Sequence, residues 1–145
     1  HWHASIERNL TTTFLMTRAV VGLMQAAQYG RIVNVSSVSG PVAAYGGDVA
    51  YHAAKAGVVG LTRSAALDTA AAGITVNAVA PGWIDTASAS DHERAMGAAT
   101  PVGRSGTPDE VAHAIAWLAA EGASYITGQL ITVDGANSIS EERGR

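Results

Sequence analysis

The segment RIVNV at residues 31–35 is short, rich in β-branched side chains and bounded by Gly30 and by serines, a pattern that predicts a buried strand. Residues 3–29, before it, carry apolar side chains at near-helical spacing and predict one helix that Gly30 ends. Residues 49–72, after it, are rich in alanine and predict a second helix that Gly73 ends. A strand therefore lies between two helices.

The same alternation continues toward the end of the chain. ITVNAV at residues 74–79 predicts a second strand, which Pro81-Gly82 breaks, and a short helical piece is expected at residues 91–98. Thr107-Pro108-Asp109-Glu110 has the N-cap, first-turn proline and capping-box spacing of a helix that runs to about residue 120. QLITV at residues 129–133 predicts a third strand.

Continuous apolar strands that alternate with helices favour an α/β fold with a parallel sheet covered on both faces. Ligands of such sheets bind in the crevice at the carboxyl ends of the strands. The loops that begin at Ser36, Pro81 and Asp134 each follow a strand, so we expect them to line one rim. We expect residues 1–145 to form a single domain, and the polar tail SISEERGR to be mobile.

Composition narrows the classes of function. With 48% hydrophobic and only 14% charged residues, the 145-residue chain has the make-up of a globular protein rather than a disordered one. The net charge is −3 without a block of Lys or Arg, which argues against nucleic-acid binding. No apolar run of about 18 residues predicts a membrane span. Cysteine is absent, which excludes disulfides and fits a cytoplasmic protein, and the five histidines predict no metal site.

Tyr51 and Lys55 are four residues apart on a predicted helix and therefore share one face. A phenol holds its proton at neutral pH, but a nearby ammonium stabilises the phenolate form. A tyrosine in that setting can pass a proton to or from a carbonyl or alcohol oxygen. Taken alone, the spacing favours an ordinary pair on a half-exposed helix surface, because Tyr and Lys occur four apart in many helices.

Three serines follow the first predicted strand, where a parallel sheet places functional loops. Ser36, Ser37 and Ser39 are all candidates to donate a hydrogen bond to a substrate oxygen, and turn or cap chemistry is the alternative use of each. No Gly-x-Ser-x-Gly motif surrounds them, which disfavours a serine hydrolase.

Five segments, in this order, resemble the short-chain dehydrogenase/reductase family: Asn9-Leu10-Thr11, IVNVSSVSG (32–40), Tyr51-x-x-x-Lys55, NAVAPGWIDT (77–86) and YITGQLITVDG (125–135). The resemblance covers residues 2–135. It implies the C-terminal part of a Rossmann-like, doubly wound parallel sheet with helices on both faces, and NADPH or NADH as the cofactor.

The resemblance also implies a role for each matching residue. Tyr51 is the general acid in carbonyl reduction and the base in alcohol oxidation, and Lys55 supports it and holds the nicotinamide ribose. Ser37 orients the substrate carbonyl, and Asn9 holds a water in the proton relay. Asn34 is structural. The implied cofactor contacts are Tyr51, Lys55, Pro81, Gly82, Ile84 and Thr86.

The glycine-rich turn with which the family binds the pyrophosphate has no counterpart in this sequence. We therefore expect the chain to be a piece of a longer protein, inactive without the rest, which an intact-mass measurement tests.

The segments GLTRSAALD (60–68) and TPDEVAHAIAWLA (107–119) are most similar to bacterial 3-oxoacyl-[acyl-carrier-protein] reductases. This similarity implies reduction of a 3-oxoacyl thioester in fatty acid biosynthesis by a homotetramer or homodimer. The alternatives are a sugar, polyol or steroid alcohol dehydrogenase, and a non-catalytic half-domain that serves as an oligomer interface. An enoyl reductase is disfavoured, because the residue seven before Lys55 is Asp48 rather than tyrosine.

Overall fold

Three parallel strands form the sheet of the computed structural model, which describes residues 1–141. They are β1 (Gly30–Val35), β2 (Ile74–Pro81) and β3 (Leu130–Val133), in the order β1-β2-β3. Gly30 pairs with Ile74, and Ala78 pairs with Leu130. The sequence prediction of three parallel strands is confirmed. The last four residues of the tail that was expected to be mobile lie outside the described residues.

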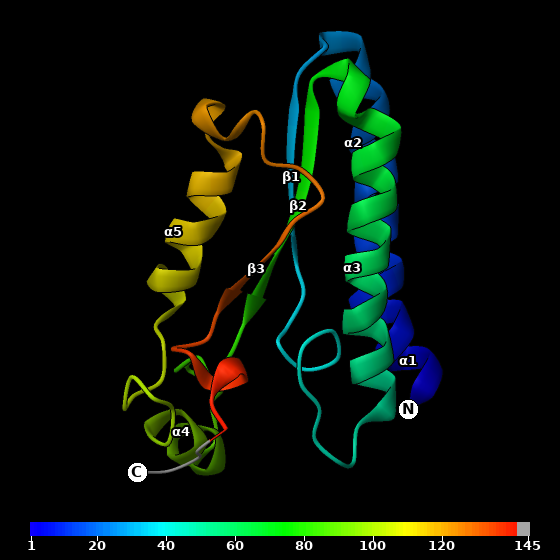
Figure 1. The fold of residues 1–145 in the computed structure, drawn as a ribbon. Helices are drawn as coiled ribbons and strands as arrows, with labels where there is room; N and C mark the ends of the chain where they lie inside the picture. The colour runs from blue at the N-terminus through cyan, green and yellow to red at the C-terminus, as the bar shows by residue number, and fades with distance from the viewer. Residues whose placement is uncertain (142–145) are drawn as a thin grey trace.

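Helices cover both faces of the sheet (Figure 1). On one face, α2 (Thr12–Ala27) and α3 (Val49–Thr69) pack on a core that includes Ile32, Ile74 and Val76. On the other, α5 (Pro108–Ala119) packs through Val111 and Leu118 on Val79. Residues of β2 therefore contribute to two separate cores, because successive side chains of a strand point to opposite faces of the sheet. The predicted α/β class with helices on both faces is confirmed.

The first helical segment differs from the single α-helix predicted over residues 3–29. It consists of α1 (Trp2–Ile6), a π-helical turn η1 (Glu7–Thr11) and α2, which ends at Ala27. The Thr12 and Thr13 hydroxyls donate to the carbonyls of Arg8 and Asn9, four residues back. Such bonds compete with the backbone hydrogen bonds of the helix. They give the wider turn a local cause that the spacing of apolar residues does not reveal.

Caps fix the ends of the remaining helices. Asp48 accepts a hydrogen bond from the Tyr51 N–H (3.1 Å) at the start of α3, and Gly73, with φ 71°, closes the 3₁₀ turn η2 (Ala70–Ala72) that follows this helix. The predicted capping box of α5 is present, and α4 (Asp91–Ala98) has one as well, made by Ser90 and Glu93. Two more 3₁₀ turns, η3 (Glu121–Ala123) and η4 (Asn137–Ile139), flank β3.

The second strand runs further than predicted. Pro81 is its last residue rather than the point where it breaks, because its carbonyl still accepts a hydrogen bond from Val38 N–H (3.1 Å). A proline lacks only the N–H, so it can close a strand through its carbonyl. Gly82 N–H then donates to Val133 (3.0 Å), which carries the pairing to β3 one residue past the strand.

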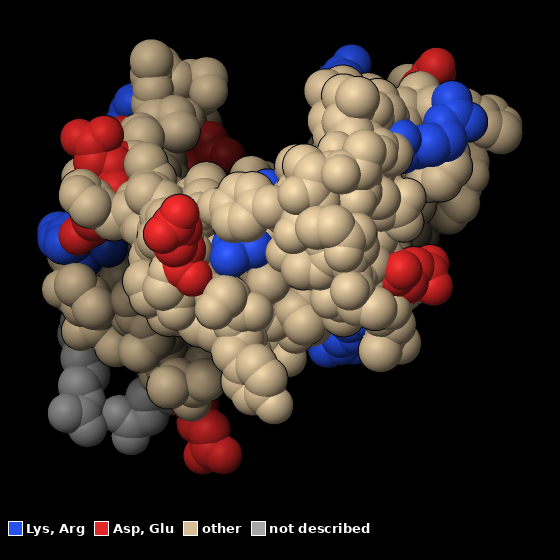
Figure 2. Space-filling view, turned by 90° about the horizontal axis from the view of Figure 1, so that it is seen from above, with Lys and Arg blue, Asp and Glu red and all other residues tan. Residues whose placement is uncertain are grey.

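The surface seen from above the fold carries Lys, Arg, Asp and Glu as scattered single residues or small groups (Figure 2). No continuous basic surface appears on this face. Within residues 1–141, none of the helices combines the length and the apolar character needed to cross a bilayer.

Candidate active site

A cavity of about 470 Å³ opens at the carboxyl ends of the strands. Ser37 reaches it from the loop after β1, Gly82 from the loop after β2 and Asn137 from η4, after β3. The three strand-following loops therefore line one rim, as predicted. The lining is completed by residues of the first loop, the start of α3 and the segment through α4: Val38, Ser39, Ala43, Ala44, Tyr45, Asp48, Tyr51, Trp83, Ile84, Thr86 and Glu93.

The structure separates the three candidate serines. Ser36 is buried and its hydroxyl donates to the Lys55 carbonyl (2.8 Å), which ties the end of β1 to α3. Ser37 and Ser39 both line the cavity. The Ser37 Oγ accepts a hydrogen bond from Ser39 N–H (3.1 Å), so its own O–H remains a donor for a ligand oxygen.

Tyr51 and Lys55 lie on the same face of α3, as their spacing predicted. Tyr51 lines the cavity, and the Lys55 Nζ lies behind it, 5.7 Å from the centre of its ring. The Nζ donates to the Val35 carbonyl (3.1 Å) at the end of β1. Burial lowers the pKa of the Lys55 ammonium. Two bonds therefore hold Lys55 at the end of β1. Its carbonyl accepts from the Ser36 hydroxyl, and its Nζ donates to the Val35 carbonyl.

Two other predicted residues lie outside the cavity lining. Asn9 is in η1, where its Nδ2 donates to Ser5 O (3.0 Å), and η1 packs along α3 with Leu10 against Gly57. A Cβ at Gly57 would come within 2.8 Å of the Leu10 side chain, so glycine permits this close approach. Pro81 also lies outside the lining.

Asn34, for which the family resemblance implies a structural role, is buried inside the fold. Its Nδ2 donates to the Thr62 Oγ1 (2.9 Å), and both side chains are buried. The bond ties β1 to α3 about two helical turns beyond Lys55.

The loop after β2 is held close to the end of β3. A Cβ at Gly82 would lie 2.7 Å from the Asp134 side chain, so the backbone passes there only because residue 82 is glycine. Ile84 and Gly106 then pair in a parallel bridge, in which Gly106 N–H donates to the Trp83 carbonyl (2.9 Å) and Asp85 N–H to the Gly106 carbonyl (2.9 Å). Thr86 is exposed beyond this pairing and bonds the Ser88 hydroxyl (3.2 Å).

Tyr45 is a cavity residue that the sequence analysis missed, and no local signal marks it. Its ring packs edge-on against His52, with centroids 4.5 Å apart. The His52 Nε2 accepts from Tyr45 N–H (3.2 Å) and the Nδ1 faces the Asp48 carbonyl (2.7 Å). A nitrogen that accepts beside one that donates is the neutral imidazole. Partial burial, and then the charges of Asp48, Tyr51 and Glu93, raise the pKa of Tyr45.

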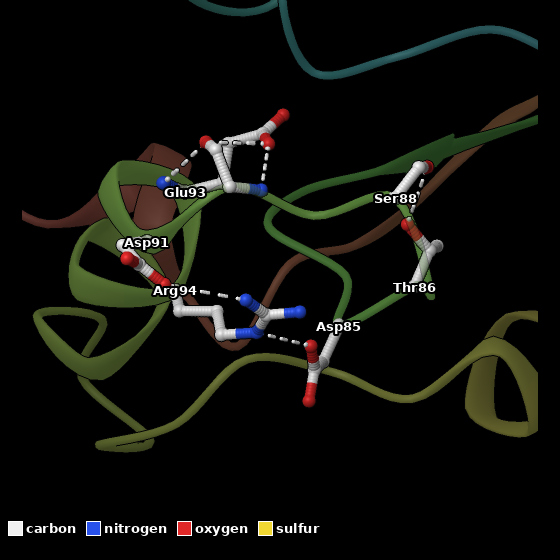
Figure 3. Close-up of polar contacts among 7 residues, drawn as sticks. Asp85, Thr86, Ser88, Asp91, Glu93 and Arg94 are labelled. Atoms are coloured by element: carbon white, nitrogen blue, oxygen red, sulfur yellow. Dashed lines mark hydrogen bonds and ion pairs between the residues drawn. The ribbon is translucent and has the colours of Figure 1, made fainter.

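Glu93 is a second missed residue, and its Ser-x-x-Glu spacing from Ser90 marks it as part of a capping box. Its carboxylate accepts from Ser90 N–H (2.7 Å) and Oγ (2.8 Å), and these bonds lower the pKa of Glu93. Figure 3 shows Glu93 and Arg94 on opposite sides of α4. Arg94 turns to Asp85, with Nε and Oδ1 3.0 Å apart, and to Asp91.

Within residues 1–141, no three side chains of His, Asp or Glu are grouped so that they could hold a metal ion. The arrangement that the structure does present is a phenol and a serine hydroxyl on one cavity, with a lysine behind the phenol ring. Its chemistry is hydrogen bonding and proton transfer at a ligand oxygen.

A family model described as Enoyl-(Acyl carrier protein) reductase matches residues 1–136. The chain belongs to the short-chain dehydrogenase/reductase family. It is 44% identical over 138 residues to 3-oxoacyl-[acyl-carrier-protein] reductase FabG of Escherichia coli K12, which covers 92% of this chain and 56% of that protein. It is 47% identical over 138 residues to cis-4-hydroxycyclohexanecarboxylate dehydrogenase of Sinomonas cyclohexanicum, covering 92% of this chain and 55% of the relative.

Solved structures show the same relationship. Acetoin dehydrogenase YohF of Salmonella typhimurium superposes with a TM-score of 0.86 at 35% identity, over 97% of this chain and 56% of that one. The chain thus spans about half the length of the relatives it matches. These likenesses confirm the resemblance stated from the sequence, including the Rossmann-like sheet.

Proposed function

We propose that this chain carries the acid–base part of an NAD(P)-dependent oxidoreductase that interconverts a carbonyl and a secondary alcohol. The observation that carries the proposal is the placement of Tyr51 and Ser37 on one cavity, with the Lys55 ammonium 5.7 Å behind the tyrosine ring. Phenol and hydroxyl come from different elements, α3 and the loop after β1, so both can face one ligand oxygen.

In this proposal Tyr51 is the proton donor in reduction. Its O–H passes a proton to the carbonyl oxygen as hydride reaches the carbonyl carbon, and an alcohol results. In oxidation the phenolate takes the alcohol proton back. Ser37 donates a hydrogen bond to the same oxygen, and the Lys55 ammonium stabilises the negative charge on the phenolate. Asn9, on the helix that packs along α3, holds a water of the proton relay.

The proposed cofactor is NADPH or NADH, whose nicotinamide supplies the hydride in reduction and accepts it in oxidation. The cavity lies at the carboxyl ends of neighbouring parallel strands, where such sheets take dinucleotides. Lys55 uses one of three ammonium donors on Val35, so it can also hold ribose hydroxyls. The loop of Pro81, Gly82, Ile84 and Thr86 would face the nicotinamide.

The test is a steady-state assay of the full-length protein with NADPH and NADH against Tyr51→Phe. Phenylalanine keeps the ring but has no proton to give, so we expect kcat to fall by about 10³-fold, within the range of acid–base catalysis. Tyr125→Phe, the same change at a fully exposed residue, should retain activity. A Tyr51→Phe enzyme that binds the cofactor and turns over at the normal rate would remove the proposed role.

For the substrate we propose a 3-oxoacyl thioester, supported by the identity to FabG, whose name gives it 3-oxoacyl-[acyl-carrier-protein] as substrate. A place in fatty acid biosynthesis, a cytoplasmic location and assembly as a homotetramer or homodimer belong to the same proposal. Reduction of the thioester but of neither sugars nor steroids would support it over the alcohol dehydrogenase alternatives.

Enoyl reduction is the other chemistry that a comparison names, through the description of the family model. The spacing of four between Tyr51 and Lys55 and the presence of Asp48, seven before the lysine, favour carbonyl reduction. Supplying a 3-oxoacyl and a 2-enoyl thioester to the same enzyme in parallel assays separates the two.

A further inference from the structure

Acidic groups dominate the charge of the candidate cavity. Asp48 lines it from the cap of α3, and Glu93 lines it from α4. Of the described residues that line this cavity, none is lysine or arginine. A ligand that carries a negative charge into it therefore meets carboxylates without a facing cation.

The nearest basic side chains are directed elsewhere. The Lys55 Nζ bonds the Val35 carbonyl behind Tyr51, and His52 has the hydrogen-bond pattern of a neutral ring. Arg94, next to Glu93 in sequence, leaves α4 on the opposite side and is held by Asp85 and Asp91 (Figure 3). Consecutive residues of one short helix thus present the acid to the cavity and the base away from it.

Asp48 and Glu93 are not equivalent in this respect. The Asp48 Oδ1 lies 3.1 Å from the His1 imidazole, so a protonated His1 offsets part of its charge. Glu93 accepts hydrogen bonds from the neutral Ser90, and these bonds, with smaller effects of the neighbouring His92 and Arg94 charges, lower its pKa. Its charge also contributes to the raised pKa of Tyr45, across the cavity mouth on the loop after β1. That contribution is the smallest of those acting on Tyr45, after burial and the charges of Asp48 and Tyr51.

We propose that Glu93 makes the enzyme select its substrates by charge. Its carboxylate favours neutral ketones, esters and thioesters over compounds that carry a free carboxylate beside the reacting carbonyl. This inference rests on the proposed carbonyl chemistry and deepens it. It accords with a thioester rather than the corresponding free 3-oxo acid as substrate. Glu93 acts through charge and does not touch the proton that moves.

The experiment compares one acyl group in two charge states. Full-length enzyme is assayed with the N-acetylcysteamine thioester of 3-oxobutanoate and with 3-oxobutanoate itself, and the ratio of kcat/KM for acid over thioester is determined. Glu93→Gln keeps the capping oxygen and removes the charge. We expect the ratio to rise about fivefold or more, since one charge a few ångströms from a carboxylate acts through partly screened solvent.

Two variants and one condition separate charge from packing. Ser90→Ala weakens the cap of α4 but leaves the carboxylate, so its ratio should stay at the wild-type value. Glu121→Gln removes a charge from η3, at the opposite end of the strands, and should also leave the ratio unchanged (Figure 1). Added salt should raise the wild-type ratio toward that of Glu93→Gln, because it screens the carboxylate.

The outcomes distinguish this inference from the proposed function. A wild-type enzyme that reduces neither compound with NADPH or NADH would contradict the proposed carbonyl reduction itself. An enzyme that reduces the thioester, but whose ratio is the same in Glu93→Gln as in wild type, leaves the chemistry standing and overturns the role of Glu93. A rise of equal size in Ser90→Ala overturns it too, since loop packing would then be the cause.

Discussion

The two walls of the cavity are built differently. The inner wall, made of Ser37, Ser39 and Tyr51 on α3 with Lys55 behind it, stands on buried structure: Ala54 and Val58 of α3 are fully buried, and Asn34 bonds Thr62 inside the core. The outer wall, residues 83–107, has one buried polar side chain, Thr100, which bonds the Gly97 and Arg104 carbonyls, and is otherwise held by surface groups. Arg94 and Asp85 are about half exposed, and so are Arg104 and Glu110.

This difference between the walls indicates which of them suits each proposed role. Buried bonds that leave an unsatisfied donor when broken resist local opening, whereas exposed ion pairs contribute less than about 1 kcal/mol each. Proton transfer needs atoms at fixed distances, which the inner wall supplies. Selection by charge needs only a long-range field, which the outer wall can exert even if it shifts.

The largest expected effect is on the inner wall. Lys55→Met keeps the length of the side chain and removes the ammonium, so the phenolate of Tyr51 loses its stabilising cation. We expect kcat to fall by about 10²-fold or more, and the pH profile of alcohol oxidation to move toward higher pH. Steady-state rates across pH check both. An unchanged profile would show that Lys55 does not act through Tyr51.

An intermediate effect is expected in the stability beneath that wall. Thr62→Val removes the acceptor of the buried Asn34 amide at nearly constant volume, which should lower the free energy of unfolding by about 1–3 kcal/mol. Thr69→Val on the same helix is the matched control, because the Thr69 hydroxyl bonds only the Ala65 carbonyl in its own helix. Denaturant titrations compare them. Equal losses would mean that the Asn34 bond is no special anchor.

The smallest effect is expected beside the outer wall, at Glu110. Hydrogen bonds from Arg104 and then from Thr107 N–H lower the pKa of Glu110 to about 2. Since the folded pKa lies below the unfolded one, the stabilisation is present above pH 4.5 and is lost as the pH falls toward 2. Melting temperatures of wild type and Glu110→Gln should therefore differ at neutral pH and converge in acid. A constant gap would contradict the assignment.

Local signals predicted the framework of the fold. The predicted bounds of the helix at residues 91–98 coincide with α4, and the N-cap, proline and capping box placed α5 correctly, because these are contacts between residues three or four apart. The π-turn was not foreseen, since it depends on threonine hydroxyls rather than on apolar spacing. Pro81 was expected to break the second strand, but it is the last residue of β2 and its carbonyl still accepts a hydrogen bond.

The site could be predicted only in part. The family motifs placed Ser37 and Tyr51, which do share a cavity, together with Lys55 just behind it. The sequence did not single out Tyr45 and Glu93, because they lie on two segments far apart in sequence, the loop after β1 and α4, that carry no joint pattern.

The π-turn has a consequence for changes in chain length. A π-turn holds one more residue than an α-helical turn and rotates the chain less per residue, since more residues complete one turn. Deleting one residue from η1 would therefore restore an α-helical turn with little change in the rotation between α1 and α2. The change would fall on the residues of the turn itself, where Leu10 contacts Gly57 and the Asn9 Nδ2 bonds Ser5 O. The extra residue of η1 thus affects what the turn presents to α3 and leaves the direction of the flanking helices largely unaffected.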